Sequence, residues 1–311
     1  MLVKYIQKNF QNRHVLCAYE AGGSGFSLHD TLTANNIECW VLSPNSIPCS
    51  KNTMVKNNRL DSQRIAQAIK SAEIPPIRIP SQEYRELRHL IRIYDNYSKA
   101  QSTAKKRIKA LLLFENLYGK ISDPAVRWTQ HFIQELEQCP CSQATRARLD
   151  ALLSDLKYAR THLATTLQAI KNFCNNSIVI HEYIDCLISI PGIGIRTASY
   201  ILGKLGDPSQ LRNPREIGAF FGLTPKENST GDRINKGSIS HAGNSIARAL
   251  LIEAAWVAIR YDKELYHFYH RIRSRNPKQS GSQKAITAVA RKLTARIYAV
   301  LKNKKKYIRT Q

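Results

Sequence analysis

The sequence predicts a mixed, mostly helical fold in three successive parts: a partial α/β domain over residues 1–75, a long-helix region over 76–180 and an all-α domain over 181–311. Two observations predict it. Near the N-terminus, short apolar runs alternate with a helical stretch, which is the strand–helix–strand pattern of α/β proteins. From residue 81 onward, apolar residues recur every three or four positions, as in amphipathic helices.

In the first part, the apolar run "HVLCAY" (14–19) ends at Glu20 and the glycine-rich "AGGSG". A helical stretch (27–35) and a second apolar run (37–44) follow. Because sites in α/β sheets form beyond the carboxyl ends of strands, Glu20 is a candidate site residue. The alternative is an acid that complements the dipole of the next helix. A further helix is predicted over 54–74, with Asp61 near its start, and "IPPIRIP" (74–80) is a predicted linker.

Two long helices are predicted in the second part, over about 81–118 and 143–174. The second has near-heptad spacing at Leu149, Leu152, Leu156, Leu163, Leu167 and Ile170. The pattern fits an intramolecular α-hairpin and equally a coiled coil between copies of the chain. Both alternatives stay open.

The third part opens with a helix, the turn "IPGIG" and a second helix over 186–207, a pattern typical of a helix–hairpin–helix motif. Gly192 and Gly194 would let backbone N–H groups approach a phosphate at a helix N-terminus. The alternative is a tight packing turn. Later helices are predicted over 213–225, 244–260 and 283–301, with a frayed basic tail after them. Arg291 and Lys292 lie off the apolar stripe of the last helix and are candidate phosphate contacts, or else a solvated face.

Between these helices, "NSTGDRINKGSISHAGNS" (228–245) is predicted to be a turn-rich loop that leads into a helix. Ser229 is either an ordinary surface residue or a nucleophile displayed to a negatively charged group. A serine hydroxyl needs a base or a metal to activate it. The basic residues of this stretch and of the next helix are candidate contacts to nucleic acid: Arg233, Lys236, His241 and Arg248.

The overall charge narrows the class of partner. Lys and Arg total 47 against 23 Asp and Glu, a formal net charge of +24, which favours a polyanion and nucleic acid above all. An anionic membrane fits less well, because the charge is spread over the whole chain. No apolar run is long enough to span a membrane, no signal peptide is evident and the seven cysteines show no zinc-site spacing. A cytoplasmic protein is expected.

Several motifs occur together in a fixed order: "YEAGG", "VKNNRLDSQRIAQAI", "SIPGIG", "FFGLTP" and "STGDRINKGSISHAGNSIARALLIEAAW". In this order they resemble the DEDD-type transposases of bacterial insertion sequences, the IS110 and IS1111 group, over nearly the whole chain. The resemblance implies a RuvC-like, ribonuclease-H-type domain whose acidic residues hold Mg²⁺. It also implies a C-terminal serine that attacks DNA covalently, a guide RNA encoded by the element, and a homo-oligomer, either a dimer or a tetramer.

Carried onto this sequence, the resemblance assigns the second acidic position to Glu20, the fourth to Asp61 and the nucleophile to Ser229. The third acid is Asn58, which can coordinate through its carbonyl oxygen but brings no charge. The opening strand with the first acid has no counterpart, so the RuvC-like domain is expected to be truncated. These departures favour a second hypothesis, an impaired remnant that only binds nucleic acid. A third, a DNA-bending or coiled-coil protein, leaves the ordered motifs unexplained.

Overall fold

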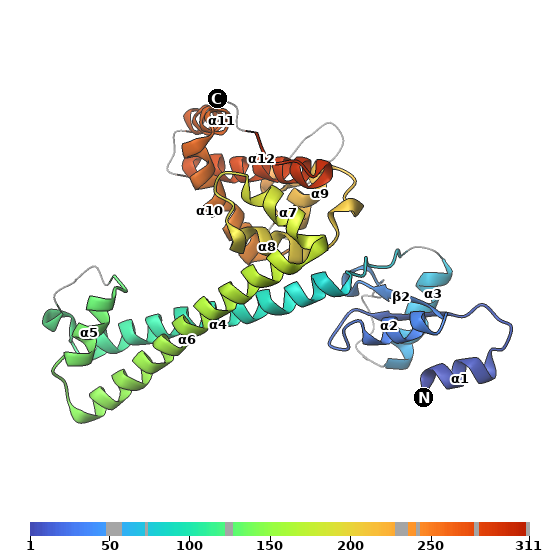
Figure 1. The fold of residues 1–311 in the computed structure, drawn as a ribbon, viewed down its shortest axis with the longest axis horizontal. Helices are drawn as coiled ribbons and strands as arrows, with labels where there is room; N and C mark the ends of the chain where they lie inside the picture. Colours follow the sequence, from blue (N-terminus) through green and yellow to red (C-terminus); the bar gives the residue numbers. More distant parts are fainter. Residues whose placement is uncertain are drawn as a thin grey trace. The chain divides into compact units, whose positions relative to one another are not determined.

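A computed structural model describes residues 1–47, 58–71, 74–121, 127–227, 236–240, 243–276 and 280–308; of Asn45, Asn58 and Lys236 only the backbone is described. The chain divides into two compact units, Met1–Pro80 and Ser81–Gln311 (Figure 1). Most of the described residues are helical, which confirms the predicted mixed, mostly α composition.

The first unit contains a two-stranded parallel sheet with helices around it. β1 (Leu16–Glu20) pairs with β2 (Glu38–Leu42), in a register that runs from Leu16 opposite Glu38 to Glu20 opposite Leu42. The other elements are α1 (Leu2–Asn9), α2 (Ser27–Ala34), a 3-10 turn (Pro44–Ser46) and α3 (Asn58–Lys70). The predicted strand–helix–strand order is confirmed within two or three residues at each boundary.

The two faces of this sheet bury different side chains. Cys17 and Cys39 pack with α1 and α2 on one face, whereas Ala18 and Leu42 pack with α3 on the other. This alternation follows from the period of two along a strand. The backbone N–H of Ile77 donates to the carbonyl of Val41 (2.8 Å), so the predicted proline linker runs beside β2.

In the second unit, the long helices α4 (Gln82–Phe114) and α6 (Gln143–Asn176) run side by side in opposite directions (Figure 1). Leu111 near the end of α4 packs with Leu149 near the start of α6, and α5 (Gln130–Gln138) closes this apolar cluster. The intramolecular α-hairpin is therefore the alternative that the structure adopts. Further elements at this end include a 3-10 turn, Tyr118–Lys120.

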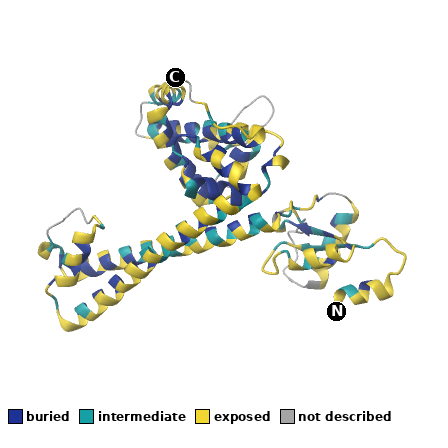
Figure 2. Cartoon of the chain, viewed as in Figure 1, coloured by how far each residue is buried: buried dark blue, intermediate teal, exposed yellow. Residues whose placement is uncertain are grey.

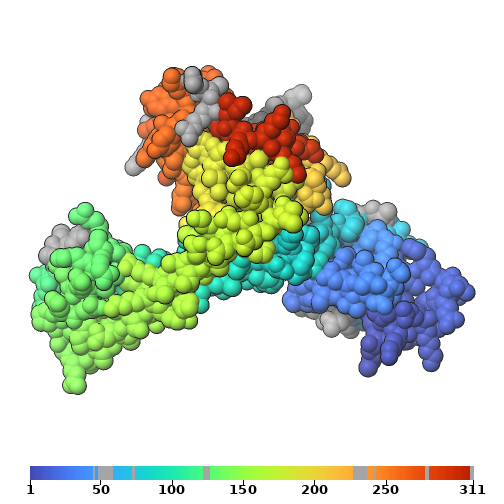
Figure 3. Space-filling view, in the orientation of Figure 1, coloured from blue at the N-terminus to red at the C-terminus, as the bar shows by residue number. Residues whose placement is uncertain are grey.

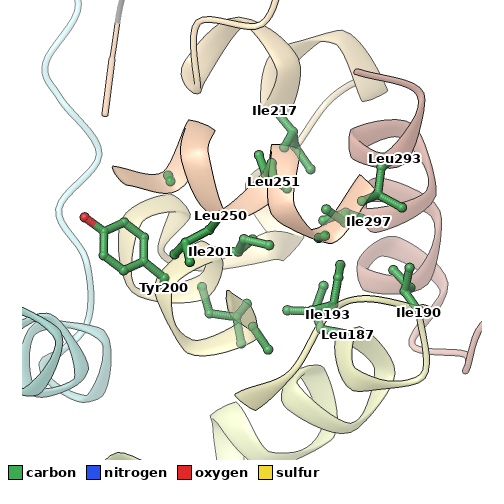
Figure 4. Packing of buried hydrophobic residues seen from close by; sticks show 14 of the residues in the cluster. Leu187, Ile190, Ile193, Tyr200, Ile201, Ile217, Leu250, Leu251, Leu293 and Ile297 are labelled. Atoms are coloured by element: carbon green, nitrogen blue, oxygen red, sulfur yellow. The ribbon is translucent and has the colours of Figure 1, made fainter. Parts of the chain in front are cut away.

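The larger core lies in the C-terminal bundle, where buried side chains concentrate (Figure 2). Leu187, Ile201 and Leu251 converge there with Ile297, each from a different helix (Figure 4). The helices are α7 (Ile178–Ile188), α8 (Ile195–Leu205), α9 (Pro214–Phe220), α10 (Ser245–Tyr261), α11 (Lys263–Ser274) and α12 (Gly281–Asn303), with a 3-10 turn at Pro208–Gln210. The bundle also contacts α4 and α6.

The tail after α12 is held more firmly than its composition predicts. The N–H of Tyr307 donates to Ser189 Oγ (2.7 Å) and its hydroxyl to Asp262 Oδ2 (2.5 Å). The expectation of a frayed tail was wrong for Tyr307, because an aromatic ring with a polar tip finds both packing and a buried acceptor. Within the described residues, no helix is long and apolar enough to span a membrane.

Candidate nucleic-acid interface

A short β-hairpin frames the segment that contains Ser229. β3 (Pro225–Glu227) and β4 (Lys236–Ile239) pair antiparallel, with Pro225 opposite Ile239 and Glu227 opposite Lys236. Glu227 and Lys236, the described residues on either side of 228–235 in the sequence, are thus paired on neighbouring strands. Ser229, Arg233 and His241 themselves lie outside the described residues.

Both ends of this β3–β4 hairpin are tied to the end of α9. Before β3, the N–H of Leu223 donates to the carbonyl of Gly218 (2.9 Å). After β4, Gly243 has a φ of +78°, and a Cβ there would lie 2.1 Å from the carbonyl oxygen of Phe220. Only glycine allows this approach. Asn244 then caps α10 by accepting hydrogen bonds from the N–H groups of Ile246 and Ala247.

Between the hairpin and α12 lies a groove of about 710 Å³. Leu223, Pro225 and Ile239 give it apolar walls, and the exposed side chains of Lys284 and Arg291 bring positive charge from α12. Its polar lining comes from Ser238, Ser280, Gln283 and Thr287. Cations together with neutral hydrogen-bonding groups suit the phosphate backbone of nucleic acid. In the space-filling view, α12 forms part of the surface of the bundle (Figure 3).

The two neighbouring cations of α12 have different surroundings. Arg291 lines the groove. The ammonium of Lys292 instead forms an ion pair with Glu264 and lies 4.9 Å from the ring centre of Phe268. Lys292 is thus held by α11, whereas the guanidinium of Arg291 lies on the side of the hairpin.

Arg248, also a candidate nucleic-acid contact, is a buried residue with 9% of its surface exposed. Its Nη1 donates to the carbonyl of Phe221 (3.1 Å). The C-terminal end of a helix leaves carbonyls without partners, and an arginine satisfies one of them. In the structure Arg248 therefore joins α10 to the end of α9.

In the turn between α7 and α8, the two glycines predicted to approach a phosphate have different surroundings. Gly192 has a φ of +87°, and a Cβ there would lie 2.3 Å from the carbonyl oxygen of Ala254 in α10. Gly194 precedes α8, is exposed and has open space where a Cβ would be. The surroundings of Gly192 are those of the packing alternative, and only Gly194 leaves the N-terminus of α8 accessible.

One hydroxyl connects the long helix α4 with the start of α10. Tyr200 of α8 lies 3.1 Å from Asp95 Oδ2 and 3.1 Å from Asn244 Oδ1. Burial raises the pKa of Asp95 above its usual value, although the hydrogen bond from Tyr200 opposes this. The same Asn244 caps α10 directly after the hairpin segment. No sequence pattern indicates this link, because Asn244 and Asp95 are 44 and 105 residues from Tyr200.

The candidate metal ligands lie in the first unit. Glu20 is the exposed last residue of β1, at the carboxyl edge of the sheet. Asp61, in the first turn of α3, is paired with Arg64 (3.3 Å) and has 44% of its side chain exposed. The side chain of Asn58 is outside what the structure describes. Among the described residues, no group of three or more His, Cys, Asp or Glu is arranged to hold a metal ion. Glu20 and Asp61 alone do not make a complete site.

Two family models match this chain. A transposase model of the DEDD, IS110 type matches residues 1–115, and a model described as the transposase IS116/IS110/IS902 family matches residues 184–270. The second match contains the turn with Gly192 and Gly194, the β3–β4 hairpin and α10.

Curated relatives agree with these matches. The transposase of insertion sequence IS1111A from Coxiella burnetii is 28% identical over 299 residues, 93% of this chain and 78% of the relative. A putative transposase, y4qE, from Sinorhizobium fredii is 26% identical over 259 residues, 82% of this chain and 60% of the relative. The transposase of IS1328 from Yersinia enterocolitica is 29% identical over 205 residues, 65% of this chain and 58% of the relative. The chain thus spans between 58% and 78% of the lengths of these relatives.

Proposed function

Because the chain belongs to the IS110 family of DEDD transposases, a family of DNA-recombining enzymes, we propose that it cuts and rejoins the DNA of an insertion sequence through Ser229. The observation that carries the proposal is the pairing of Glu227 with Lys236, the two described residues that flank 228–235 in the sequence. The strands β3 and β4 line a groove that also contains Lys284 and Arg291. Ser229 follows Glu227 by two residues in the sequence, and we propose that its hydroxyl meets a phosphodiester held in this groove.

In the proposed reaction, the Ser229 hydroxyl attacks a DNA phosphorus atom and displaces a deoxyribose hydroxyl. The bond from serine oxygen to phosphorus forms as the bond from phosphorus to sugar oxygen breaks. The serine proton passes to a base, and the leaving oxygen gains a proton. Arg291 and Lys284 hold the strand by its phosphates, and Arg233, Lys236 and His241 are further basic residues close in sequence to the serine.

Mg²⁺ is part of the proposal, with Glu20 and Asp61 as carboxylate ligands and Asn58 as a neutral oxygen donor. Hard cations depend on the number and charge of their oxygen ligands. Two carboxylates are expected to bind Mg²⁺ more weakly than a full DEDD set would. We therefore assign Mg²⁺ no individual step of the reaction.

The partners proposed are double-stranded DNA, a guide RNA encoded by the element and further copies of the same chain, as a dimer or tetramer. The net charge of +24 supports a polyanionic partner. The long α4–α6 hairpin offers an extended surface for contacts between copies. With such a substrate, the proposed location of the protein is the bacterial nucleoid in the cytoplasm.

The groove can be tested by DNA binding. Arg291→Gln and Lys284→Gln should each weaken binding to duplex DNA from the insertion-sequence end several-fold. Each should also reduce the slope of log K against log salt by about 1, because one phosphate contact is lost. Fluorescence anisotropy over a salt series measures both quantities. Lys263→Gln, which removes an exposed cation from α11, is the matched control. Equal losses in all three variants would mean that only overall charge matters, and would remove the groove from the proposal.

The second candidate function is nucleic-acid binding without catalysis. The observation that favours it is the lack of an acidic cluster among the described residues. A chain of this kind would bind DNA with the same salt dependence and the same response to Arg291→Gln, yet never become joined to it. Only a measurement of strand chemistry separates the two candidates.

A further inference from the structure

A second groove, of about 460 Å³, lies between α4 and α6, on helices outside the β3–β4 hairpin site. Three alanines contribute to its lining, and two of them are buried: Ala104 with 4% and Ala159 with 1% of the surface exposed. The small side chains keep the two helices from filling the space between them. Tyr97 and Tyr158 also line the groove. Its volume falls within the range of about 300–1,000 Å³ in which small molecules bind.

Three aromatic rings hold each other at one end of this groove. Tyr97 and His162 are stacked, with ring centres 4.8 Å apart and planes 12° apart. Tyr158 lies 4.1 Å from His162 and 6.0 Å from Tyr97. Even so, 59% of Tyr158 is exposed to solvent. The neighbouring rings fix the orientation of Tyr158, so a planar ligand could stack on it at little cost in side-chain entropy.

The charges around the groove are arranged unequally. Lys99 and Arg107, both exposed, come from α4, whereas Asp155 comes from α6. Lys106 and Lys109 continue the exposed positive charge along α4. An anionic group is therefore attracted to the α4 side and repelled from the α6 side. On the α6 side, the Asp155 carboxylate can accept hydrogen bonds from an amino group.

We propose that this groove binds an unpaired nucleotide of a single-stranded nucleic acid. The base stacks on Tyr158, and its phosphates lie toward Lys99 and Arg107. Asp155 then faces the edge of the base, where an exocyclic amino group can donate to it. Aromatic rings combined with cations are the usual means of holding single strands. A duplex does not offer the face of a base, because its bases are stacked on one another.

The test uses the full-length protein and fluorescein-labelled oligonucleotides of about eight nucleotides, in ribo and deoxyribo form. Tyr158→Ala should weaken binding on the order of 10-fold, the effect of losing one stacked base. Tyr158→Phe keeps the ring and should bind as the unchanged protein does. Tyr261→Ala, which removes an equally exposed tyrosine (61%) from α10, is the matched control. Arg107→Gln should weaken binding and lower its salt dependence. Binding of these short probes requires no strand cleavage, so this site is tested independently of the strand chemistry.

The ribo and deoxyribo probes separate the two sources of a single strand: tighter RNA binding indicates a guide RNA and equal binding indicates any unpaired strand. Equal affinities of the Tyr158→Ala and Tyr261→Ala variants would overturn the proposal. So would a Tyr158→Ala variant that binds the probes normally but sediments as a smaller species, because the groove would then be an interface between copies of the chain. Unchanged circular dichroism and melting temperature exclude misfolding as the cause of a loss.

Discussion

Gly192 and Gly194 stand two residues apart in one turn, yet the structure gives them different surroundings. We expect Gly192→Ala to lower the free energy of unfolding by about 1–3 kcal/mol, because a Cβ at this positive φ meets the carbonyl of Ala254. Gly194→Ala should change it by less than about 1 kcal/mol, because a Cβ there meets nothing within 4 Å. Urea denaturation of the two variants measures the difference. Equal effects would mean that the α7–α8 turn does not pack on α10 as described.

The contacts of individual residues were less predictable from the sequence than the elements to which they belong. The "IPGIG" pattern predicted the turn and its two helices. It could not distinguish an approach to a phosphate from a contact with a neighbouring helix, because both require the same glycines. Arg248 and Lys292 were predicted as phosphate contacts because they are basic. In the structure, Arg248 donates to the carbonyl of Phe221, and Lys292 forms an ion pair with Glu264. These partners are distant in sequence, so the apolar periodicity of the helices did not indicate them.

At the scale of elements, α11 begins at a buried carboxylate. Asp262 accepts from the N–H of Leu265 (2.9 Å), pairs with Arg296 and accepts from the Tyr307 hydroxyl. Asp262→Asn should lower the free energy of unfolding by about 3–5 kcal/mol at pH 7, because Arg296 loses its buried partner. Glu264→Gln, on the half-exposed partner of the same arginine, should cost about 1 kcal/mol or less. Denaturant unfolding of both variants checks this, and similar losses would contradict it.

The same carboxylate gives this stability a pH dependence. Burial would raise the pKa of Asp262, but the hydrogen bonds from Tyr307, Leu265 and Arg296 outweigh burial and lower it below its usual value of 3.8. Such a group stabilises the fold fully above that usual value and loses its effect as the pH falls through the lowered pKa. The difference in stability between the unchanged protein and Asp262→Asn should therefore shrink below about pH 3.8.

Elements with a clear apolar pattern could be predicted from the sequence. The two strands within 16–42 were predicted from their apolar runs and the long helices from their periodic patterns, and the structure confirms them. The prediction of a loop over 228–245 was wrong for β4, and the helix predicted over 213–225 ends at Phe220, so that Pro225 belongs to β3. Strands of three and four residues are too short to show alternation. The groove beside the β3–β4 hairpin also needs α12, which is distant in sequence. The sequence therefore identified Arg291 as a candidate contact but did not indicate that it lines a groove.

At the scale of the whole molecule, the proposed activity needs residues of both units: Ser229 in one, Glu20 and Asp61 in the other. A positive charge of +24 accounts for binding to nucleic acid whether or not catalysis occurs. DNA binding alone therefore does not distinguish a transposase from a remnant, whereas a covalent bond between protein and DNA does.

The most direct measurement is a search for that bond. The purified protein is incubated with labelled DNA from the end of the insertion sequence, the guide RNA encoded by the element and Mg²⁺. The mixture is then run on a denaturing gel. The account predicts a band of protein joined to DNA that is absent with Ser229→Ala, present with the neighbouring Thr230→Ala and lost when EDTA removes the metal. An adduct that persists in Ser229→Ala would contradict the assignment of the nucleophile. Normal DNA binding with no adduct in any variant would contradict catalysis by this chain.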